Sequence, residues 1–171
     1  MDGTGLARRA RRRERSEKGI VHTIRPTGPA DGDTLVEIWR SSVHATHDFV
    51  SKQDLAEIEA EVREIVALEP LWLALDAAGE PLGFLGLSTN AVDALFVAAE
   101  HRGTGVGRAL IDFAKSRHSW LITIVNEQNE QALGFYEHAG FRPEGRSADD
   151  GHGRPYPVLH MRWIGAQRGG G

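Results

Sequence analysis

The sequence predicts a single α/β domain in which a mixed β-sheet carries helices on both faces. The chain has 171 residues and is 40% hydrophobic, which is enough for one buried core and too little for two ordinary domains. Short apolar runs alternate along it with segments of helical periodicity. One apolar run leads through several glycines directly into a helical segment, an order that phosphate-binding folds use.

The first part of the chain predicts a strand and two helices. Residues 20–25 read as a short strand closed by Pro26, and a helix is expected to begin at Asp31 or Asp33. Its apolar and small residues recur at three- and four-residue steps: Leu35, Ile38, Trp39, Ser42, Thr46 and Phe49. A second helix follows through Leu55, Ile58, Val62 and Ile65, and its other side, with Glu57, Glu59, Glu61 and Glu64, is interpreted as solvated.

The rest of the chain predicts six more strands and two more helices. Residues 71–75 and 82–87 flank a turn at Gly79 and form a hairpin. Residues 92–98 are apolar on both faces, as in a central strand covered on both sides. The remaining elements are a helix at 106–117, a strand at 121–125, a helix at 129–139 with Gly140 at its C-terminal end, and strands near 141–145 and 158–163.

Charge divides the chain unevenly. Residues 1–19 hold seven basic and three acidic side chains, whereas the rest holds 13 basic and 21 acidic ones. Because residues 1–19 have little apolar surface to bury, we expect a disordered basic arm there, a folded domain at 20–164 and a flexible tail at 165–171. The arm is interpreted as solvated rather than as an RNA-binding or membrane-surface segment.

Composition also excludes several classes of protein. The chain has no cysteine, which excludes a structural disulfide and a cysteine nucleophile. No segment approaches the ~20 apolar residues of a membrane helix, and no apolar run of about 7 to 15 residues follows the basic start, as a secretory signal requires. We therefore expect a cytoplasmic protein without membrane association.

The glycine-rich segment at 102–108 is the main candidate for a ligand site. Glycines between a strand and a helix leave backbone N–H groups uncovered beside the positive end of the helix dipole, where a pyrophosphate can bind. A Walker loop requires lysine after its last glycine, but Gly107 is followed by Arg108. The dinucleotide fingerprint places its third glycine where Arg108 stands, and no acid lies about 20 residues on. Neither alternative fits.

The segment Arg102-Gly103-Thr104-Gly105-Val106-Gly107 matches the Arg/Gln-x-x-Gly-x-Gly/Ala signature of the GNAT superfamily of N-acetyltransferases. Asn129, Phe135-Tyr136 and the end of the next helix at Ala139-Gly140-Phe141 add to the match. The chain resembles this superfamily over residues 20–164, and most closely its YjaB-type bacterial branch. The resemblance implies a largely antiparallel sheet of six to seven strands, with a splay between two central strands and helices on both faces.

The resemblance also implies acetyl-coenzyme A as acetyl donor and a primary amine as acceptor, either a protein lysine or a small amine. The cofactor-binding residues implied are Leu95, Phe96 and Val97 on a strand that pairs with the pantetheine amides, Arg102, Gly103, Thr104, Gly105, Val106, Gly107 and Arg108 around the pyrophosphate, and Asn129. Each arginine is equally well interpreted as a surface side chain.

The resemblance assigns Tyr136 as the general acid that protonates the departing thiolate and Asp93 as a candidate general base. Asn129 and Tyr136 lie two helical turns apart and therefore on one face. Alternatives remain open at each position: a buried aromatic ring for Tyr136, a helix N-cap for Asn129, and a solvated strand-end carboxylate for Asp93. Without cysteine, we expect direct transfer in a ternary complex.

Two further groups of side chains attract attention. His44, His47 and Asp48 share a helical face, but further ligands are lacking, so we interpret them as an exposed polar face and expect no metal. In the family that the chain resembles, the first helices and the last hairpin loop border the acceptor pocket. This implies that the substrate lies near His47, Asp48, Asp149, Asp150 and His152. The pair Asp150-Gly151 also suits a turn.

Two functions other than amine acetylation stay open: a non-catalytic acyl-coenzyme A sensor and an RNA-directed acetyltransferase that uses the basic arm. Nucleic acid is the less favoured partner. The sequence does not distinguish a monomer from a homodimer.

Overall fold

The computed structural model describes residues 20–166, so the expected basic arm and most of the expected tail lie outside the described residues. The strands are β1 (Thr23–Pro26), β2 (Trp72–Leu75), β3 (Pro81–Ser88), β4 (Ala91–Val97), β5 (Trp120–Asn126), β6 (Arg142–Ser147) and β7 (Val158–Ile164). The helices are α2 (Gly32–Thr46), α3 (Lys52–Leu68), α4 (Val106–Arg117) and α5 (Glu130–His138), with short 3₁₀ turns η1 (Pro29–Asp31) and η2 (Ala99–His101). None of these helices combines the length and the apolar character needed to cross a bilayer.

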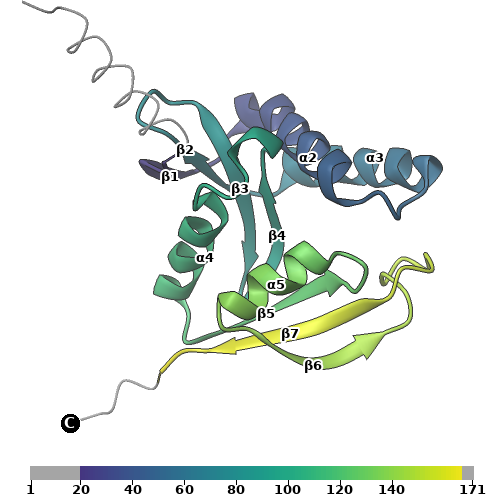
Figure 1. Ribbon diagram of the computed structural model, residues 1–171. Coiled ribbons are helices and arrows are strands. Elements are labelled where there is room, and N and C mark those ends of the chain that lie inside the picture. The colour runs from purple at the N-terminus through teal and green to yellow at the C-terminus, as the bar shows by residue number, and fades with distance from the viewer. Residues whose placement is uncertain (1–19, 167–171) are drawn as a thin grey trace, which may run out of the picture.

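The strands form one sheet of seven in the order β1-β2-β3-β4-β5-β7-β6. Every neighbouring pair is antiparallel except β4 and β5, which are parallel. This confirms the expected mixed, largely antiparallel sheet. In Figure 1 the strands β2 to β4 run steeply, whereas β5, β7 and β6 cross below them, so the sheet turns sharply between its two halves.

The two halves of the sheet meet only along a short seam. The strands β4 and β5 pair through Ala91 with Ile122 and through Val92 with Thr123, and no further. Beyond the seam, β4 continues to pair with β3 up to Val97, and β5 continues to pair with β7. The central strands therefore splay apart after Val92, as expected, and each leaves one backbone edge without a neighbouring strand there.

Helices cover both faces of the sheet. The helix α2 packs on β3 and β4 with α3 against it, and α4 packs on the other face of the same strands, while α5 lies over β5 (Figure 1). Alternation along β3 shows the two layers, because buried Phe84 joins the cluster under α2 whereas buried Leu85 joins the cluster under α4. Each face thus has its own core.

The start of the domain differs from the expected strand. The strand β1 covers Thr23–Pro26 rather than residues 20–25, and Pro26 stands inside it, opposite Trp72. Proline is tolerated because β1 lies at the edge of the sheet. Asp31 precedes α2, but its carboxylate accepts two hydrogen bonds from Arg25 at 2.9 Å instead of capping the helix. The pair ties the edge strand to the start of α2.

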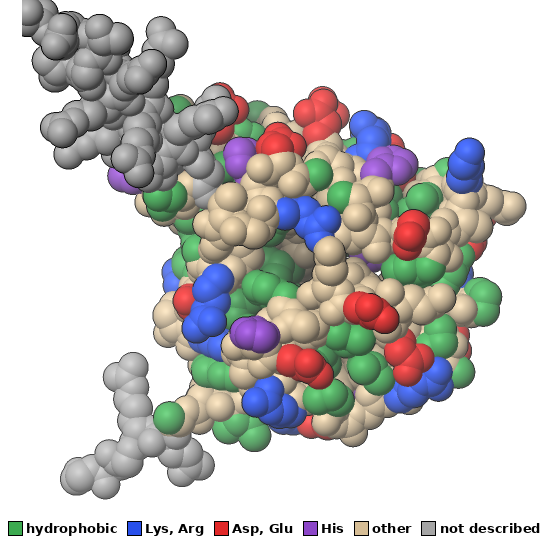
Figure 2. Space-filling view, in the orientation of Figure 1, with side chains coloured by type: hydrophobic (Ala, Val, Ile, Leu, Met, Phe, Trp, Pro, Cys, Tyr) green, Lys and Arg blue, Asp and Glu red, His purple; other side chains and the backbone are tan. Residues whose placement is uncertain are grey.

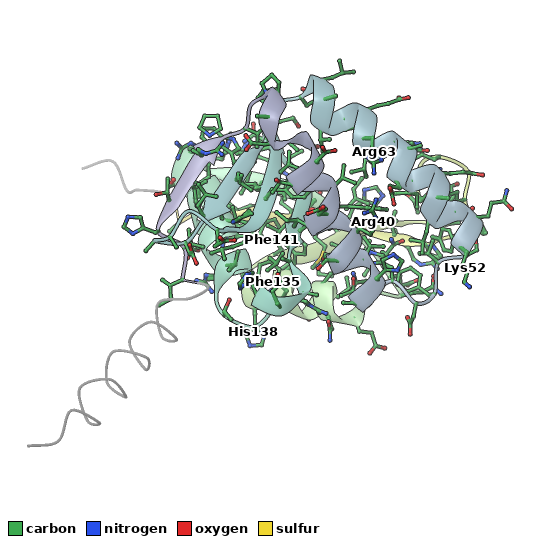
Figure 3. All side chains as sticks on the ribbon, turned by 90° about the horizontal axis from the view of Figure 1, so that it is seen from above. Arg40, Lys52, Arg63, Phe135, His138 and Phe141 are labelled. Carbon is green, nitrogen blue, oxygen red and sulfur yellow. The ribbon has the colours of Figure 1, made fainter. Side chains whose placement is uncertain are left out.

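The glutamates of α3 are not simply a solvated face, which corrects the sequence interpretation. Glu59 binds Arg40 of α2 at 2.6 Å and Arg63 of its own helix at 3.1 Å, and the labelled arginines show where the two helices meet in Figure 3. Glu61 binds Arg154, which comes from the loop between β6 and β7, at 2.6 Å. Both glutamates are half-buried because their partners come from other parts of the fold.

Candidate active site

A cavity of about 540 Å³ lies where the two halves of the sheet separate. Figure 2 shows the surface hollowed near its middle, with hydrophobic side chains inside the hollow. The end of α2, the strand β4, the glycine loop, the end of β5 and the helix α5 all contribute to its wall. Its lining includes Ser42, Thr46, His47, Asp93, Leu95, Phe96, Val97, Arg102, Gly103, Gly105, Val106, Gly107, Arg108, Thr123, Asn126, Asn129, Gln131, Phe135 and Tyr136.

The glycine loop presents an anion site to this cavity. Gly103 has φ +72° and Gly105 has φ +93°, and side-chain-bearing residues rarely adopt this left-handed conformation. Gly105 is the N-cap of α4, and no side chain caps the helix there. The amides of the first turn of α4 therefore lack partners within the helix, and the positive end of its dipole faces the loop. A pyrophosphate fits this arrangement.

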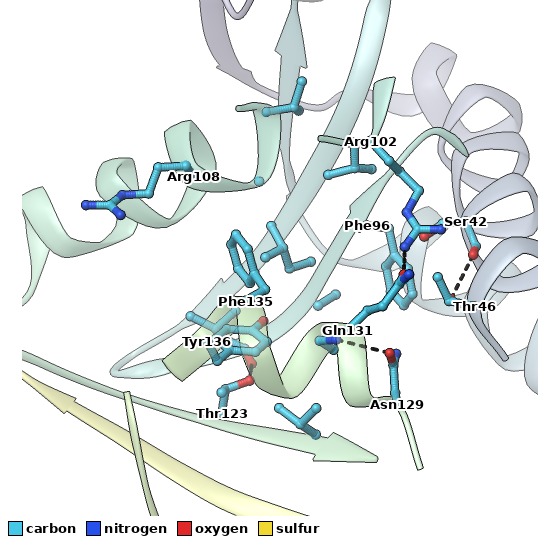
Figure 4. A pocket seen from close by; sticks show the side chains of 18 of the residues that line it. Ser42, Thr46, Phe96, Arg102, Arg108, Thr123, Asn129, Gln131, Phe135 and Tyr136 are labelled. Atoms are coloured by element: carbon cyan, nitrogen blue, oxygen red, sulfur yellow. Dashed lines mark hydrogen bonds between the residues drawn. The ribbon is translucent and has the colours of Figure 1, made fainter. Parts of the chain in front are cut away.

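The neighbours of the loop fix its position. Gly107 lets α4 approach α5, because a Cβ atom added there would lie 3.2 Å from the ring of Phe135. Arg102 donates a hydrogen bond to the side-chain carbonyl of Gln131 on α5 (Figure 4). Arg108 pairs with Asp112 one turn along α4, at 3.0 Å, on the exposed side of the helix. Thr104, alone among the expected cofactor-binding residues, does not line the cavity; its hydroxyl donates to the carbonyl of His101.

The strand β4 supplies a backbone edge and a carboxylate. Gly86 pairs with Ala94 but Leu87 pairs with Val92, so Asp93 is an extra residue on β4 without a partner on β3. Such a β-bulge increases the local twist and redirects a side chain. Asp93 is exposed and lines the cavity beside the splay. Val92 is buried, but the remaining residues of β4 are only half-buried, which corrects the expected burial on both faces and follows from the cavity beside them.

Tyr136 lines the same cavity from α5 and is 6% exposed. Burial raises the pKa of its hydroxyl to about 12, although the neighbouring Thr123 hydroxyl acts in the opposite direction (Figure 4). The hydroxyl is therefore protonated throughout the neutral range. The rings of Phe135 and Phe141 pack edge-on against it at centroid distances of 5.2 Å. Tyr136 is thus both a core ring and a cavity residue, and the two interpretations coexist.

Asn129 also serves two roles. Its side-chain oxygen accepts a hydrogen bond from the amide of Ala132 at 3.1 Å, which makes it the N-cap of α5. The residue lines the cavity as well, so a cap is not an alternative to a ligand contact here. The cap fixes the direction in which α5, and with it Tyr136, enters the cavity wall.

Only some of the residues that were expected near the acceptor line the cavity. His47 lines the cavity, and burial lowers its pKa, which favours a neutral imidazole. Asp48 is absent from the cavity wall, and so are Asp149, Asp150 and His152 of the loop between β6 and β7, which corrects their expected place. They shape the loop instead: Asp149 accepts from the amide of Gly151 and Asp150 accepts from the amide of His152, each at 2.8 Å. This is the turn chemistry that was left open.

That loop is fastened to α3. Arg154 binds Glu61 at 2.6 Å and Asp150 at 3.2 Å, and Tyr156 donates a hydrogen bond to Asp54. The ring of Tyr156 also meets Phe49 edge-on at 6.3 Å. These contacts join the loop after β6 to the segment between α2 and α3.

Thr123 and Asn126 are among the cavity residues that the sequence interpretation did not assign to a site. Thr123 is 4% exposed on β5, where a β-branched residue looks like an ordinary strand residue. Asn126 ends β5, and its side-chain oxygen is the one buried side-chain acceptor without a partner among residues 20–166. Its place just before the Asn129 cap was the only signal available. An unpaired acceptor in a cavity wall suits a ligand N–H group.

Comparison with known proteins agrees with this geometry. A family profile described as "Acetyltransferase (GNAT) domain" matches residues 67–143. The chain is 46% identical over 147 residues to peptidyl-lysine N-acetyltransferase YjaB of Escherichia coli (strain K12), covering 86% of this chain and 100% of that protein. This chain belongs to the GNAT acetyltransferases. Its YjaB counterpart in Salmonella typhimurium is 44% identical over 142 residues, covering 83% of this chain and 98% of that one.

The fold agrees as well. The solution structure of the apo form of Escherichia coli YjaB superposes with a TM-score of 0.80, at 46% identity, covering 84% of this chain and 98% of that chain. As a GNAT enzyme, the chain is an acetyl-coenzyme A-dependent N-acetyltransferase that acts on an amine. Within residues 20–166, no three His, Asp or Glu side chains gather closely enough to hold a metal ion.

Proposed function

We propose that this protein acetylates lysine side chains of other proteins, by direct attack of the lysine amine on acetyl-coenzyme A. The observation that carries the proposal is the cavity at the splay, which brings the glycine loop, the free edge of β4 and the hydroxyl of Tyr136 together. The peptidyl-lysine activity named for the 46% identical relative supports the acceptor class. The helix α3 carries five acidic and two basic side chains, and this excess of negative charge favours the approach of cationic segments.

The donor fits the cavity in two places. The amides at the start of α4, flanked by Gly103 and Gly105, would hold the pyrophosphate, with Arg102 close by. The open edge of β4 from Leu95 to Val97 would hydrogen-bond the pantetheine amides as a neighbouring strand does. Asn129 and the unpaired oxygen of Asn126 lie along the same wall. This leaves the thioester near Tyr136.

The proposed chemistry needs one acid and one base. The amine nitrogen forms a bond to the thioester carbonyl carbon, the carbon–sulfur bond breaks, and the departing sulfur takes the proton of the Tyr136 hydroxyl. The raised pKa of Tyr136 ensures that this proton is present at neutral pH. Asp93, placed at the bulge of β4, accepts the amine proton directly or through water. The chain contains no cysteine, so no cysteinyl intermediate can form.

A transfer assay tests the proposal. Purified protein is incubated with acetyl-coenzyme A and either lysine-containing peptides, polyamines or small amines, while free thiol is followed. We expect thiol release that depends on the lysine peptide, and acetyl-lysine in the product by mass spectrometry. Tight donor binding without release on any acceptor would contradict transfer and favour a sensor. Release only with small amines would contradict the protein acceptor.

The general acid is tested separately. Tyr136→Phe keeps the ring and removes only the proton donor, so we expect kcat to fall about 100-fold or more while donor affinity changes little. Tyr156→Phe is the matched control, because Tyr156 is the second of two tyrosines and lies outside the cavity wall. Full activity of Tyr136→Phe would remove the acid assignment and leave the donor site intact.

A further inference from the structure

The imidazole of His47 is held in place by two linked hydrogen bonds at the end of α2. Its Nδ1 atom lies 2.7 Å from the hydroxyl oxygen of Thr46, and the same hydroxyl donates to the backbone carbonyl of Ser42 at 2.9 Å. Figure 4 shows the bond between Thr46 and Ser42. The ring of Phe49 packs against the imidazole at a centroid distance of 5.3 Å. Because His47 lines the cavity, its ring has a fixed position in the cavity wall.

Counting protons assigns the tautomer of this imidazole. A threonine hydroxyl has one proton, and a carbonyl oxygen has no proton to give. Since the Thr46 proton goes to the Ser42 carbonyl, the hydroxyl can only accept from His47, so Nδ1 carries the ring proton. In a neutral imidazole the other nitrogen, Nε2, then has a free lone pair. The hydrogen bonds within residues 20–166 include none to Nε2.

His47 and Tyr136 reach the cavity from opposite faces of the sheet. The helix α2 packs through Trp39 and Val43 into the core cluster on one face, whereas Tyr136 belongs to the cluster on the other face, under α4. Both His47 and Tyr136 line the cavity where β4 and β5 separate. A thioester held between these strands would therefore have the proposed acid on one side and an unprotonated ring nitrogen on the other.

A lysine acceptor must lose two protons from its nitrogen. The ordinary pKa of a lysine side chain is about 10.4, so at neutral pH its nitrogen carries three protons and has no lone pair for attack. One proton leaves before the attack and another leaves as the amide forms, and Asp93 accounts for only one of them. An imidazole is a stronger base than a carboxylate, since their ordinary pKa values are about 6.5 and about 3.9. Burial lowers the pKa of His47, so its ring is neutral at pH 7 and returns a proton to solvent readily.

We propose that Nε2 of His47 is the base that removes the first proton from the lysine ammonium group, after which the neutral amine attacks the thioester. The inference rests on the proposed function and adds a catalytic residue to it. A nitrogen–hydrogen bond of the ammonium group breaks, one forms at Nε2, and the electron pair stays on the amine nitrogen. Over one turnover the amine nitrogen gives one proton to His47 and one to Asp93. The sulfur takes the proton of Tyr136, which regains one, so a single proton is released to solvent.

The ionisation of His47 should set the acid side of the pH profile. Asp48 raises the pKa of His47, but burial lowers it more, so the ring is protonated only below its ordinary 6.5. Because the imidazole must be neutral to act, kcat/KM for a lysine peptide should fall as the pH decreases through that lowered pKa. The other titratable groups around it are Asp93, His101, Arg102, Arg108 and Tyr136 in the cavity wall, and Tyr156 and Asp54 beyond Phe49.

Steady-state kinetics on the full-length protein test the assignment, with His47→Gln and His44→Gln as a matched pair. His44 lies about one turn earlier in α2, is exposed and does not line the cavity. We expect His47→Gln to lower kcat for a lysine peptide about 100-fold or more and to remove the acid limb of the pH profile. The KM for acetyl-coenzyme A should change less than about threefold, and His44→Gln should behave as the native protein does. A His47→Gln protein with native kcat, or with the acid limb intact, would overturn the proposal.

A less basic acceptor separates proton removal from a structural role of His47. In a peptide with thialysine in place of lysine, the sulfur atom lowers the pKa of the amine, so more of it is already neutral. The loss of kcat in His47→Gln should therefore be at least about threefold smaller on the thialysine peptide than on the lysine peptide. An equal loss on both peptides would indicate a structural role and contradict the assignment.

A measurement without substrate tests the tautomer itself. Long-range ¹H–¹⁵N NMR spectra distinguish protonated from unprotonated ring nitrogens, and His47→Gln identifies the signals of His47 among the eight histidines. We expect a proton on Nδ1 and none on Nε2 at neutral pH, and a proton on Nε2 would overturn the inference. Failure of the native protein to acetylate any amine would overturn the proposed function, whereas a fully active His47→Gln protein overturns this inference alone.

Discussion

Gly105→Ala should weaken binding of acetyl-coenzyme A about 5- to 30-fold. Gly105 has φ +93°, and forcing a residue with a Cβ into the left-handed region costs roughly 1 to 2 kcal/mol. A Cβ added there meets no atom within 4 Å, so the cost is backbone strain and not a clash. The open space around that Cβ also gives residue 105 room to relax when the loop is empty. The cost of the strain then weakens binding, because the loop must return to its native conformation to hold the donor.

Isothermal titration calorimetry with acetyl-coenzyme A measures this effect, with Gly134→Ala as the matched control. Gly134 lies in α5, a Cβ added there meets nothing within 4 Å, and the residue does not line the cavity. Glycine to alanine inside a helix stabilises by roughly 0.5 to 1 kcal/mol, so this variant should melt higher and bind normally. A Gly105→Ala protein that binds the donor within twofold of the native affinity would refute the role of the loop.

Three further substitutions test the fold. Arg25 holds the pKa of Asp31 at about 2, below its ordinary 3.8, so the pair stabilises the protein above pH 4 and is lost as the pH falls to 2. Asp31→Asn should lower the free energy of unfolding by about 1 kcal/mol at pH 7, a value reduced to allow for the solvent exposure of Arg25. In urea titrations at several pH values, the variant should also lose less stability than the native protein between pH 4 and pH 2. Gly83→Ala should cost about 1 to 3 kcal/mol in the same titrations, because its Cβ would lie 2.7 Å from the backbone oxygen of Phe96; an unchanged midpoint would contradict the packing. Arg154→Leu should lower the melting temperature in calorimetry, because it leaves partly buried carboxylates unpaired, and an unchanged value would show that the loop holds without it.

The parts of the fold that follow from local pattern were predictable. The helix at 106–117 has the predicted bounds, because an apolar stripe runs along it and a glycine with positive φ precedes it. The turn at Gly79, with φ +83°, and Gly140, with φ +90° after α5, also stand where the sequence placed them. In each case a single residue type is required by the local backbone.

The parts that depend on distant partners were not predictable. Thr123 fits any strand, and only its place opposite Val92 at the end of the seam gives its hydroxyl a partner. Arg154 lies in a loop without periodicity, and its partner Glu61 is 93 residues away in the chain. The bulge at Asp93 cannot be seen in β4 alone, since it is defined by the register with β3. These features arise in tertiary packing.

The short seam between β4 and β5 has a consequence for local opening of this protein. Two residue pairs hold the halves of the sheet together at its centre, so opening should begin there rather than at the outer strands. A donor that hydrogen-bonds the free edge of β4 would take the place of a neighbouring strand for as long as it is bound. Amide protons near the splay should therefore exchange rapidly in the empty protein and slow down once the donor is bound, which makes acetyl-coenzyme A a transient structural element as well as a reactant.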